Sequence, residues 1–298
     1  MIAPSSNDEH LTDLARAKVN LALHITGQRA DGYHLLDSLV VFPAIADELK
    51  ARRSSEMGFA VSGDQASALN TGNDNDNLVV KALRAFQQAT NQPDLQIDFE
   101  LNKALPVASG IGGGSADAAA ALRLIEELST AKLTAQERQE LALSLGADVP
   151  VCLAQAPRRM EGIGELLSPL PKLPSCGMVL VNPGISVSTP AIFNSLACRD
   201  NPPLPELPPS FNTLSELIDY LAATRNDMQA VAETICPEIT HVISALSVQP
   251  ECKLARMSGS GATCFALCTP GEEQTLTNKI QKSHPSWWVA SSKTLQPD

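Results

Sequence analysis

The chain has 298 residues, of which 44% are hydrophobic, and a formal net charge of −11 at pH 7. This length is enough for two medium-sized domains with cores of their own, and the charge disfavours a nucleic-acid partner because it repels a phosphate backbone. The apolar runs are too short to span a bilayer, and the seven cysteines include no Cys-x-x-Cys pair, so we expect a cytoplasmic protein without disulfides or cysteine-bound metal.

Strands and helices alternate through the first half of the chain. From Ala17 to Ile25, apolar residues alternate with mostly polar ones, which predicts a strand with one buried face that places Lys18 and Asn20 together on the other face. The residues that follow predict a turn at 30–32, an apolar stretch at 35–46, a polar irregular region at 54–75, a helix that begins at Asn77 and a strand at 95–101.

A glycine-dense loop then joins a strong helix-forming segment at residues 106–120, whose sequence is PVASGIGGGSADAAA. Glycine can adopt positive φ and has no Cβ, so the loop N–H groups can turn toward one anion. The helix adds its unpaired N–H groups and the positive end of its dipole. We expect Ser115 to cap this helix and Asp117 to lie in its first turn, so that the segment forms a phosphate-binding cradle.

The spacing of this loop differs from two common glycine motifs. A Walker A loop needs Gly-Lys-Ser/Thr, but Ser115 and Ala116 stand where the lysine would be. A Rossmann turn needs Gly-x-Gly-x-x-Gly, and neither a start at Gly110 nor one at Gly112 places a glycine sixth. A flexible glycine linker is the remaining alternative, but linkers rarely end in a capped alanine-rich helix.

The second half of the chain continues with mixed elements. A capping box, in which Glu137 follows Thr134, starts a predicted helix that ends at Leu145. We predict an α+β protein of two lobes, with an N-terminal domain at 1–158 and a C-terminal domain at 159–298. The other expected elements are a loop region after Pro157, a strand at 177–181, a proline-rich connector at 201–209, helices at 214–221 and 227–246, a second glycine turn that runs into a strand at 257–267, and a short polar terminus.

Five segments, in one order along nearly the whole chain, resemble the GHMP kinase superfamily, named for galactokinase, homoserine kinase, mevalonate kinase and phosphomevalonate kinase. They are the phosphate loop at 106–120 and the segments at 15–21, 30–34, 145–151 and 257–262. The resemblance implies a two-lobed α+β fold, with mixed sheet, helices and phosphate loop in the N-terminal lobe and an α/β sandwich as the C-terminal lobe. It also implies a kinase that transfers phosphate from ATP to an alcohol carrying a cytidine diphosphate group.

The resemblance assigns the catalytic roles to Lys18 and Asp148. Asp148 is the natural base for the acceptor hydroxyl, and we expect Pro150 to hold Val149 extended and so to stiffen the segment that presents the carboxylate. A neighbouring Lys18 would keep Asp148 ionised and would compensate the charge of the γ-phosphate. Asp148 either accepts the proton or orients the hydroxyl. Without the resemblance, the alternative interpretation is that Lys18 is a solvated residue on the open face of a strand and that Asp148 is an aspartate in a turn.

The resemblance also assigns residues to ATP and Mg²⁺. It implies that Asn77 and Lys103 lie near adenine and that the Ser115 hydroxyl reaches the phosphates or Mg²⁺. We expect no dedicated protein ligands for the metal beyond Ser115, because ATP oxygens and water usually hold this ion. The phosphate loop supplies the remaining ATP-binding residues, which are Pro106, Val107, Ala108, Ser109, Gly110, Ile111, Gly112, Gly113, Gly114, Ser115 and Ala116.

For the acceptor substrate, the resemblance points to aromatic residues around the cytosine ring. Tyr33 and His34 match positions where the family stacks a ring on cytosine and bonds its edge, and Phe193 would close the other face. Thr189 would approach the substrate, and Asn20 shares the strand face of Lys18. A tyrosine that packs in the core is the alternative for Tyr33.

Two departures from the family pattern and two rival functions stay open. Ala116 stands where many relatives have a second serine, and Arg158-Arg159 is either a surface pair or an extra anion contact. The rival functions are a superfamily kinase acting on a simpler alcohol, such as homoserine or mevalonate, and a nucleotide-binding protein without turnover. The oligomeric state, a monomer or a weak homodimer, is also open.

Overall fold

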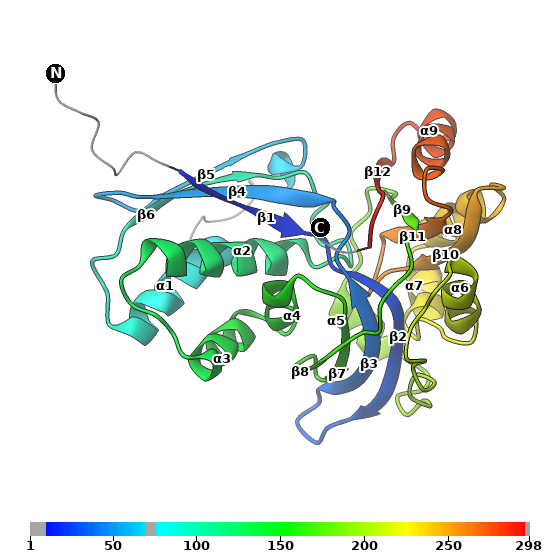
Figure 1. The fold of residues 1–298 in the computed structure, drawn as a ribbon, viewed down its shortest axis with the longest axis horizontal. Helices are drawn as coiled ribbons and strands as arrows, with labels where there is room; N and C mark the ends of the chain where they lie inside the picture. Colours follow the sequence, from blue (N-terminus) through cyan, green and yellow to red (C-terminus); the bar gives the residue numbers. More distant parts are fainter. Residues whose placement is uncertain (1–9, 70–75, 296–298) are drawn as a thin grey trace. The chain divides into compact units, whose positions relative to one another are not determined.

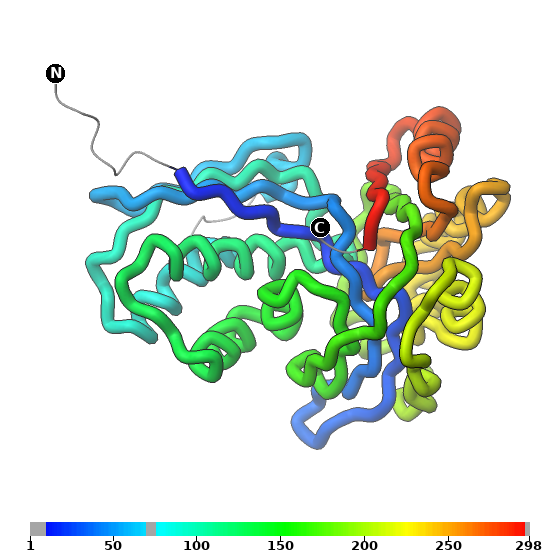
Figure 2. The backbone as a smooth tube through the Cα atoms, in the orientation of Figure 1, coloured from blue at the N-terminus to red at the C-terminus, as the bar shows by residue number. Residues whose placement is uncertain are grey.

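A computed structural model describes residues 10–69 and 76–295, and the chain can be followed in Figure 2. It divides into two compact units, each built from several segments. The first unit contains Met1–Arg16, Ala46–Val107 and Gly113–Ala154, and the second contains Ala17–Ile45, Ala108–Gly112 and Gln155–Asp298. The predicted domain boundary at 158 stays a prediction. The two units are not divided at a single point of the chain, because the second unit also contains two segments that precede residue 158.

The first unit is a sheet with helices packed on it (Figure 1). The sheet runs in the order β1-β4-β6-β5, with antiparallel pairs except for the parallel pair β5–β6. Helix α2 packs against β1 and β4, and α1 packs against α2. The elements are β1 (Leu11–Arg16), β4 (Ala46–Arg53), β5 (Gly58–Ser62), β6 (Ile97–Asn102), α1 (Leu78–Thr90), α2 (Gly113–Leu128), α3 (Ala135–Leu145), α4 (Val149–Ala154) and a 3-10 turn (Ala66–Ala68).

The second unit contains two sheets, in the orders β2-β3-β7-β8 and β10-β11-β9-β12, among its described residues. Its hydrophobic core joins β2, β9, β10 and β11 to helices α5, α7, α8 and α9. The elements are β2 (Val19–Gln28), β3 (His34–Val41), β7 (Arg158–Gly162), β8 (Leu166–Pro169), β9 (Gly177–Asn182), β10 (Cys252–Met257), β11 (Cys264–Cys268), β12 (Trp288–Ser292), α5 (Thr189–Ser195), α6 (Leu214–Ala222), α7 (Gln229–Ile235), α8 (Glu238–Ser247) and α9 (Glu273–Ser283).

The predicted helix start at Asn77 and the predicted capping box at Thr134 are confirmed. Asn77 caps α1, with its side chain accepting a hydrogen bond from the N–H of Val79 at 2.9 Å. Thr134 and Glu137 form the predicted capping box at the start of α3. Both motifs depend on residues two or three apart, so the sequence alone contains the information.

The prediction that β2 has one buried face is wrong. Asn20 and His24 on the second face are 0% and 1% exposed. The edge of β2 at Leu23 is covered by residues 225–227, whose backbone bonds with Leu23 at 2.9 Å in both directions. The His24 ring is satisfied by the carbonyl of Pro202 and the N–H of Arg225. Polar residues are therefore buried on β2 because distant segments bond to them.

Several elements lie where the sequence analysis expects none. β5 lies in the region expected to be irregular, of which residues 70–75 fall outside the described residues; β7 and β8 follow Pro157, and α9 and β12 form much of the terminus. These strands are short and pair with distant partners, such as β7 with β3. The helix expected at 227–246 is two helices, because Pro237 lacks an N–H and its ring obstructs a continuous helix.

Candidate active site

The central part of the glycine loop, residues 108–112, belongs to the second unit. Ala108, Gly110 and Gly112 have φ of +50°, +74° and +63°, so the loop curves sharply. The Ile111 carbonyl accepts the N–H of Lys18 at 2.9 Å, and the Ser109 carbonyl accepts that of Thr263 at 3.1 Å. The carbonyls of Ser109 and Ile111 thus bond the loop to two other segments of this unit.

A second glycine turn, residues 258–261, lies directly against Gly110. A Cβ on Gly110 would lie 2.5 Å from the Ser258 carbonyl oxygen, so glycine is required by contact as well as by φ. The Ser258 hydroxyl donates to the Gly110 carbonyl at 3.1 Å. The turn joins β10 to β11, so it runs into a strand as predicted.

The second glycine turn is held by Asn226, a residue that the sequence analysis does not single out. The Asn226 amide donates to the carbonyls of Met257 at 2.9 Å and Gly259 at 2.8 Å. Its oxygen accepts the N–H of Met228 at 3.0 Å. Every bond of this buried amide is therefore satisfied. An Asn-Asp pair before a helix is too common a pattern to have predicted the role.

Helix α2 begins three residues earlier than a cap at Ser115 would place it. It starts at Gly113, so Ser115 lies inside its first turn and is not the cap. A residue that is itself helical cannot supply the cap geometry. Ser115 nevertheless lies at the start of the helix, and its hydroxyl is 4.0 Å from the position a Cβ would take on Gly146.

Lys103 and Asp117 form part of a buried ionic cluster in the first unit. The Lys103 ammonium donates to Asp47 at 2.5 Å and to Asp117 at 2.7 Å. Burial raises the pKa of Asp117 to about 7, against the opposing charge of Lys103 and with a contribution from Asp47. Burial alone would lower the pKa of Lys103, but the two carboxylates outweigh it and the pKa is raised. The place of Lys103 near adenine stays a prediction.

Asp148 lies in the turn directly before α4. Its carbonyl accepts the N–H of Cys152 at 3.1 Å, which is the first helical bond of α4. Val149 is therefore helical, and the expectation of an extended Val149 is wrong. Pro150 is tolerated because the first turn of a helix needs no N–H from it. Asp148 occupies the position before the first helical residue, so its placement is set by the start of α4.

Lys18 is not a solvated strand residue. It lies between β1 and β2, is 4% exposed and belongs to the second unit, whereas Asp148 belongs to the first. A Cβ on Gly112 would lie 3.3 Å from the Cβ and 3.4 Å from the Cε of Lys18, so the lysine stem runs along the glycine loop. The loop therefore sets the course of the lysine side chain within this unit.

Asn20 bonds two serines, Ser38 through its side-chain amide and Ser258 through its backbone N–H. Ser38 donates its one hydroxyl proton to the Ala22 carbonyl at 2.6 Å, so it must accept the bond from the Asn20 amide at 2.8 Å. This fixes which side of the amide is oxygen. The Asn20 N–H donates to the Ser258 hydroxyl at 3.1 Å, which connects β2 to the second glycine turn.

The aromatic residues lie near the turn between β2 and β3. Tyr33 is 58% exposed, so the alternative of a core tyrosine is wrong. His34 stacks on Phe193, with ring centroids 4.5 Å apart and an angle of 18° between the rings. Burial and the charge of Arg199 lower the pKa of His34, which favours a neutral ring. Phe193 thus faces His34 directly in this structure.

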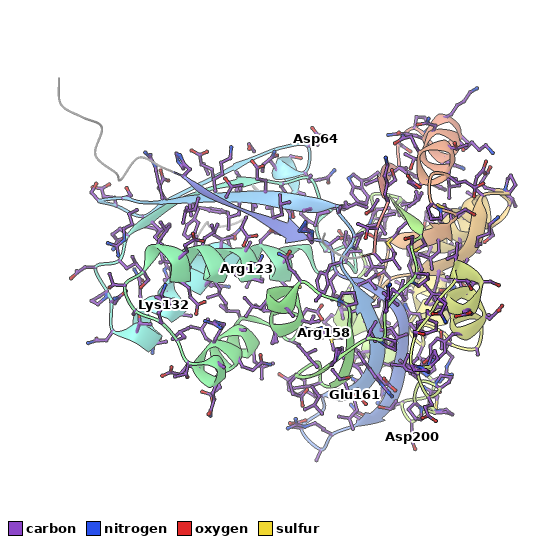
Figure 3. The ribbon with its side chains drawn as sticks, viewed as in Figure 1. Asp64, Arg123, Lys132, Arg158, Glu161 and Asp200 are labelled. Atoms are coloured by element: carbon purple, nitrogen blue, oxygen red, sulfur yellow. The ribbon has the colours of Figure 1, made fainter. Side chains whose placement is uncertain are left out.

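Thr189 and Arg159 each form hydrogen bonds with a specific side chain in the structure, Thr189 with Ser260 and Arg159 with Asp37. The Thr189 hydroxyl is 2.7 Å from the Ser260 hydroxyl, which brings the start of α5 to the second glycine turn. Arg159 donates two bonds to Asp37, at 2.8 and 2.7 Å, and Asp37 also accepts the N–H of Leu204. Asp37, which Arg159 bonds, therefore attaches the proline-rich connector at Leu204. Figure 3 labels the neighbouring Arg158 on β7, which donates to the Pro157 carbonyl.

The second unit thus brings together Lys18, Asn20, the loop at 108–112, the second glycine turn and Thr189. The first unit brings together Lys103, the start of α2 and Gly146. Among residues 10–69 and 76–295, no group of three or more His, Cys, Asp or Glu side chains could hold a metal ion. No helix in these residues is long and apolar enough to cross a membrane.

Comparison with known proteins gives matches along nearly the whole chain. Residues 77–155 match the GHMP kinases N terminal domain, and residues 204–286 match the GHMP kinases C terminal domain. The 4-diphosphocytidyl-2-C-methyl-D-erythritol kinase of Cereibacter sphaeroides is 47% identical over 94% of this chain and 97% of its own. The enzyme of that name from Agrobacterium fabrum is 44% identical over 95% and 96%.

Solved structures show the same pattern. A crystal structure of 4-(cytidine 5'-diphospho)-2C-methyl-D-erythritol kinase matches with a TM-score of 0.75 and 29% identity, over 94% of this chain and 98% of that one. A homoserine kinase from Cytophaga hutchinsonii matches with a TM-score of 0.67 and 18% identity, over 99% and 98%. The second likeness is one of fold alone.

Proposed function

Because the chain belongs to the 4-diphosphocytidyl-2-C-methyl-D-erythritol kinase family of GHMP kinases, we propose that it transfers the γ-phosphoryl group of ATP to the 2-hydroxyl of 4-diphosphocytidyl-2-C-methyl-D-erythritol. The products are the 2-phosphate and ADP. The chain is an ATP-dependent small-molecule kinase of isoprenoid precursor biosynthesis, by the non-mevalonate route. The observation that carries the proposal is the sequence identity to these kinases, which extends through both units.

In the proposed reaction, the 2-hydroxyl oxygen forms a bond to the γ-phosphorus as the bond to the leaving oxygen of ADP breaks. Asp148 takes up the hydroxyl proton or orients the hydroxyl for attack. Lys18 compensates the negative charge that spreads over the transferring group. The course of the Lys18 stem along Gly112 supports this role, because the glycine loop is the proposed phosphate site.

The loop at 106–116 and the start of α2 bind the ATP phosphates through backbone N–H groups and the helix dipole. The resemblance assigns Asn77 and Lys103 to the surroundings of the adenine ring. Mg²⁺ arrives on ATP and supplies charge neutralisation, and the Ser115 hydroxyl is the protein oxygen that would reach it.

The cytidine end of the substrate binds at Tyr33, His34 and Phe193. The exposed Tyr33 ring is free to stack on a base, and a neutral His34 carries both a donor and an acceptor for its edge. Thr189 and Asn20 contact the sugar alcohol. The stack of His34 on Phe193 supports the presence of an aromatic surface here, and cytosine binding would compete with that stack.

ATP consumption by the purified protein with Mg²⁺ tests the function. The acceptors are 4-diphosphocytidyl-2-C-methyl-D-erythritol, homoserine, mevalonate and 2-C-methyl-D-erythritol 4-phosphate. We expect turnover with the cytidyl compound alone. Turnover with a simple alcohol would support a GHMP kinase but contradict the proposed cytidine site. No turnover with any of the four acceptors would favour a nucleotide-binding protein without catalytic activity.

A further inference from the structure

Asp47, Lys103 and Asp117 form a buried brace that nothing above uses in the reaction. Their side chains are 0%, 2% and 3% exposed. Lys103 bonds both carboxylates through one ammonium group. Asp47 lies on β4, Lys103 directly follows β6, and Asp117 lies on α2. All three belong to the first unit.

Asp47 holds the chain segment that leads into the glycine loop. One carboxylate oxygen binds Lys103, and the other accepts the backbone N–H groups of Ala104 at 2.7 Å and Leu105 at 2.8 Å. Both residues come immediately before Pro106. The start of the loop is therefore attached to β4 by three bonds to one buried side chain.

Lys103 and Asp117 hold the other end of the loop. A Cβ on Gly113, the first residue of α2, would lie 3.2 Å from the Lys103 nitrogen and 3.8 Å from the Cβ of Leu105. Asp117 lies one turn further along the helix and bonds the same nitrogen. The brace thus fixes Leu105 and Gly113, which flank residues 106–112, with respect to each other.

Stability is a weak reason for such a brace. Removing charges from water costs free energy, and apolar side chains of similar volume often stabilise a core equally well. The cluster also carries two carboxylates for one ammonium group. Ionic bonds differ from apolar contacts in being directional, so they hold the first turn of α2 in one orientation. Further along α2, Arg123, which Figure 3 labels, bonds Asp13 at 2.6 Å and the Cys152 carbonyl at 3.1 Å.

We propose that Asp47, Lys103 and Asp117 are positioning residues for the phosphates of ATP. They set the spacing between Leu105 and Gly113, and so they aim the N–H groups at the start of α2 before ATP binds. This inference rests on the proposed function, and it gives Lys103 a role toward the phosphates rather than toward adenine. Loss of the brace then weakens binding of the phosphates and spares binding of the nucleoside.

The test compares Lys103→Met, Asp47→Asn and Asp117→Asn in the full chain. We expect the KM for ATP to rise by about 10- to 100-fold in Lys103→Met, the range that a small misplacement of binding groups costs. The Kd of ADP should rise in parallel, while the Kd of adenosine, the ATP to GTP preference and the KM for the cytidyl substrate stay near wild type. Lys50→Met and Asp98→Asn on the same sheet are matched controls, because their ion pairs are partly exposed.

Each other outcome overturns the inference. A loss of the preference for ATP over GTP, with the Kd of adenosine raised as much as that of ADP and the KM for the cytidyl substrate unchanged, would make Lys103 an adenine contact. Equal weakening of ADP, adenosine and the cytidyl substrate would make the brace merely structural. Kinetics equal to those of the controls would leave it without a role. If the wild-type protein shows no turnover, the proposed function is wrong. The positioning role of the brace can still be tested in that case, by comparing the Kd of ADP with the Kd of adenosine in the variants.

Lys103→Met leaves two buried carboxylates without their partner and risks unfolding. The variant Asp47→Asn/Lys103→Met/Asp117→Leu removes all the charges and keeps similar volumes, so it tests the brace in a core without buried charge. We expect it to fold and to retain the raised Kd for ADP. A wild-type Kd for ADP in this variant would overturn the inference.

Discussion

In the proposed reaction, Asp148 is the residue that accepts the proton of the acceptor hydroxyl or orients that hydroxyl. Asp148→Asn keeps the size of the side chain and the backbone bond from Cys152, so α4 should still start at the same residue. We expect kcat to fall by at least about 100-fold, the scale of losing a general base, with the Kd of ATP nearly unchanged. Asp64→Asn, in an exposed turn, is the control. Near-normal turnover in Asp148→Asn would remove this residue from the mechanism.

Tyr33 is the exposed aromatic residue of the proposed cytidine site. Tyr33→Ala removes a ring that makes little contribution to the core, because 58% of it is exposed. We expect the cytidyl substrate to bind more weakly by about 1–3 kcal/mol, the value of one base stacked on an aromatic ring, with ATP binding unchanged. Tyr33→Phe should restore binding. Equal losses for both substrates would point to a folding role.

Contact between the two glycine elements explains why glycine is needed at position 110. Gly110→Ala combines a positive φ with a Cβ 2.5 Å from the Ser258 carbonyl oxygen. Gly271→Ala is the matched control, since its φ is +93° but nothing lies within 4 Å. Left-handed strain costs about 1–2 kcal/mol in either variant, and the clash adds about 1–3 kcal/mol at Gly110. Urea denaturation measures the free energy of unfolding of both variants. An equal loss of stability in the two variants would contradict the contact between Gly110 and Ser258.

Helix α2 contains a carboxyl group that should make stability depend on pH. The pKa of Asp117 is raised by burial to about 7 from 3.8, so the folded state keeps this proton where the unfolded state has lost it. The contribution of Asp117 to the free energy of unfolding therefore falls as pH rises from about 4 to 7. Asn at position 117 does not titrate, so the variant Asp117→Asn does not lose this free energy of unfolding as pH rises. Its stability relative to wild type should increase between pH 5 and pH 8 in denaturant titrations, and a constant difference would contradict the shift.

At the scale of the whole molecule, the requirement for Mg²⁺ should follow ATP rather than the protein. The described residues contain no acidic or histidine cluster for a metal, so we expect calorimetry to detect no Mg²⁺ binding by the protein without nucleotide. Chelation should abolish turnover, and added Mg²⁺ should restore it. Tight Mg²⁺ binding to the protein alone would mean that the protein itself provides the ligands.

The sequence by itself determined the features that depend on neighbouring residues. The glycine loop, the cap of α1 by Asn77 and the capping box of α3 are local, because φ preference and hydrogen bonds two or three residues apart define them. The motif order also identified the family that the comparisons show. The roles of Lys18, Asp148 and the other predicted site residues stay predictions.

Tertiary structure alone decided which distant residues meet. Asp47 and Lys103 lie 56 residues apart, and no local pattern predicts that a buried ammonium group joins them. Asn226 bonds Gly259, and Asp37 bonds Arg159 across 122 residues, in the same way. The sheets also depend on pairing between strands that are far apart in the sequence. For this reason β5, β7 and β12 were not predicted. A short strand gains its hydrogen bonds and its burial from its partner strand, so its own residues carry too little of the information.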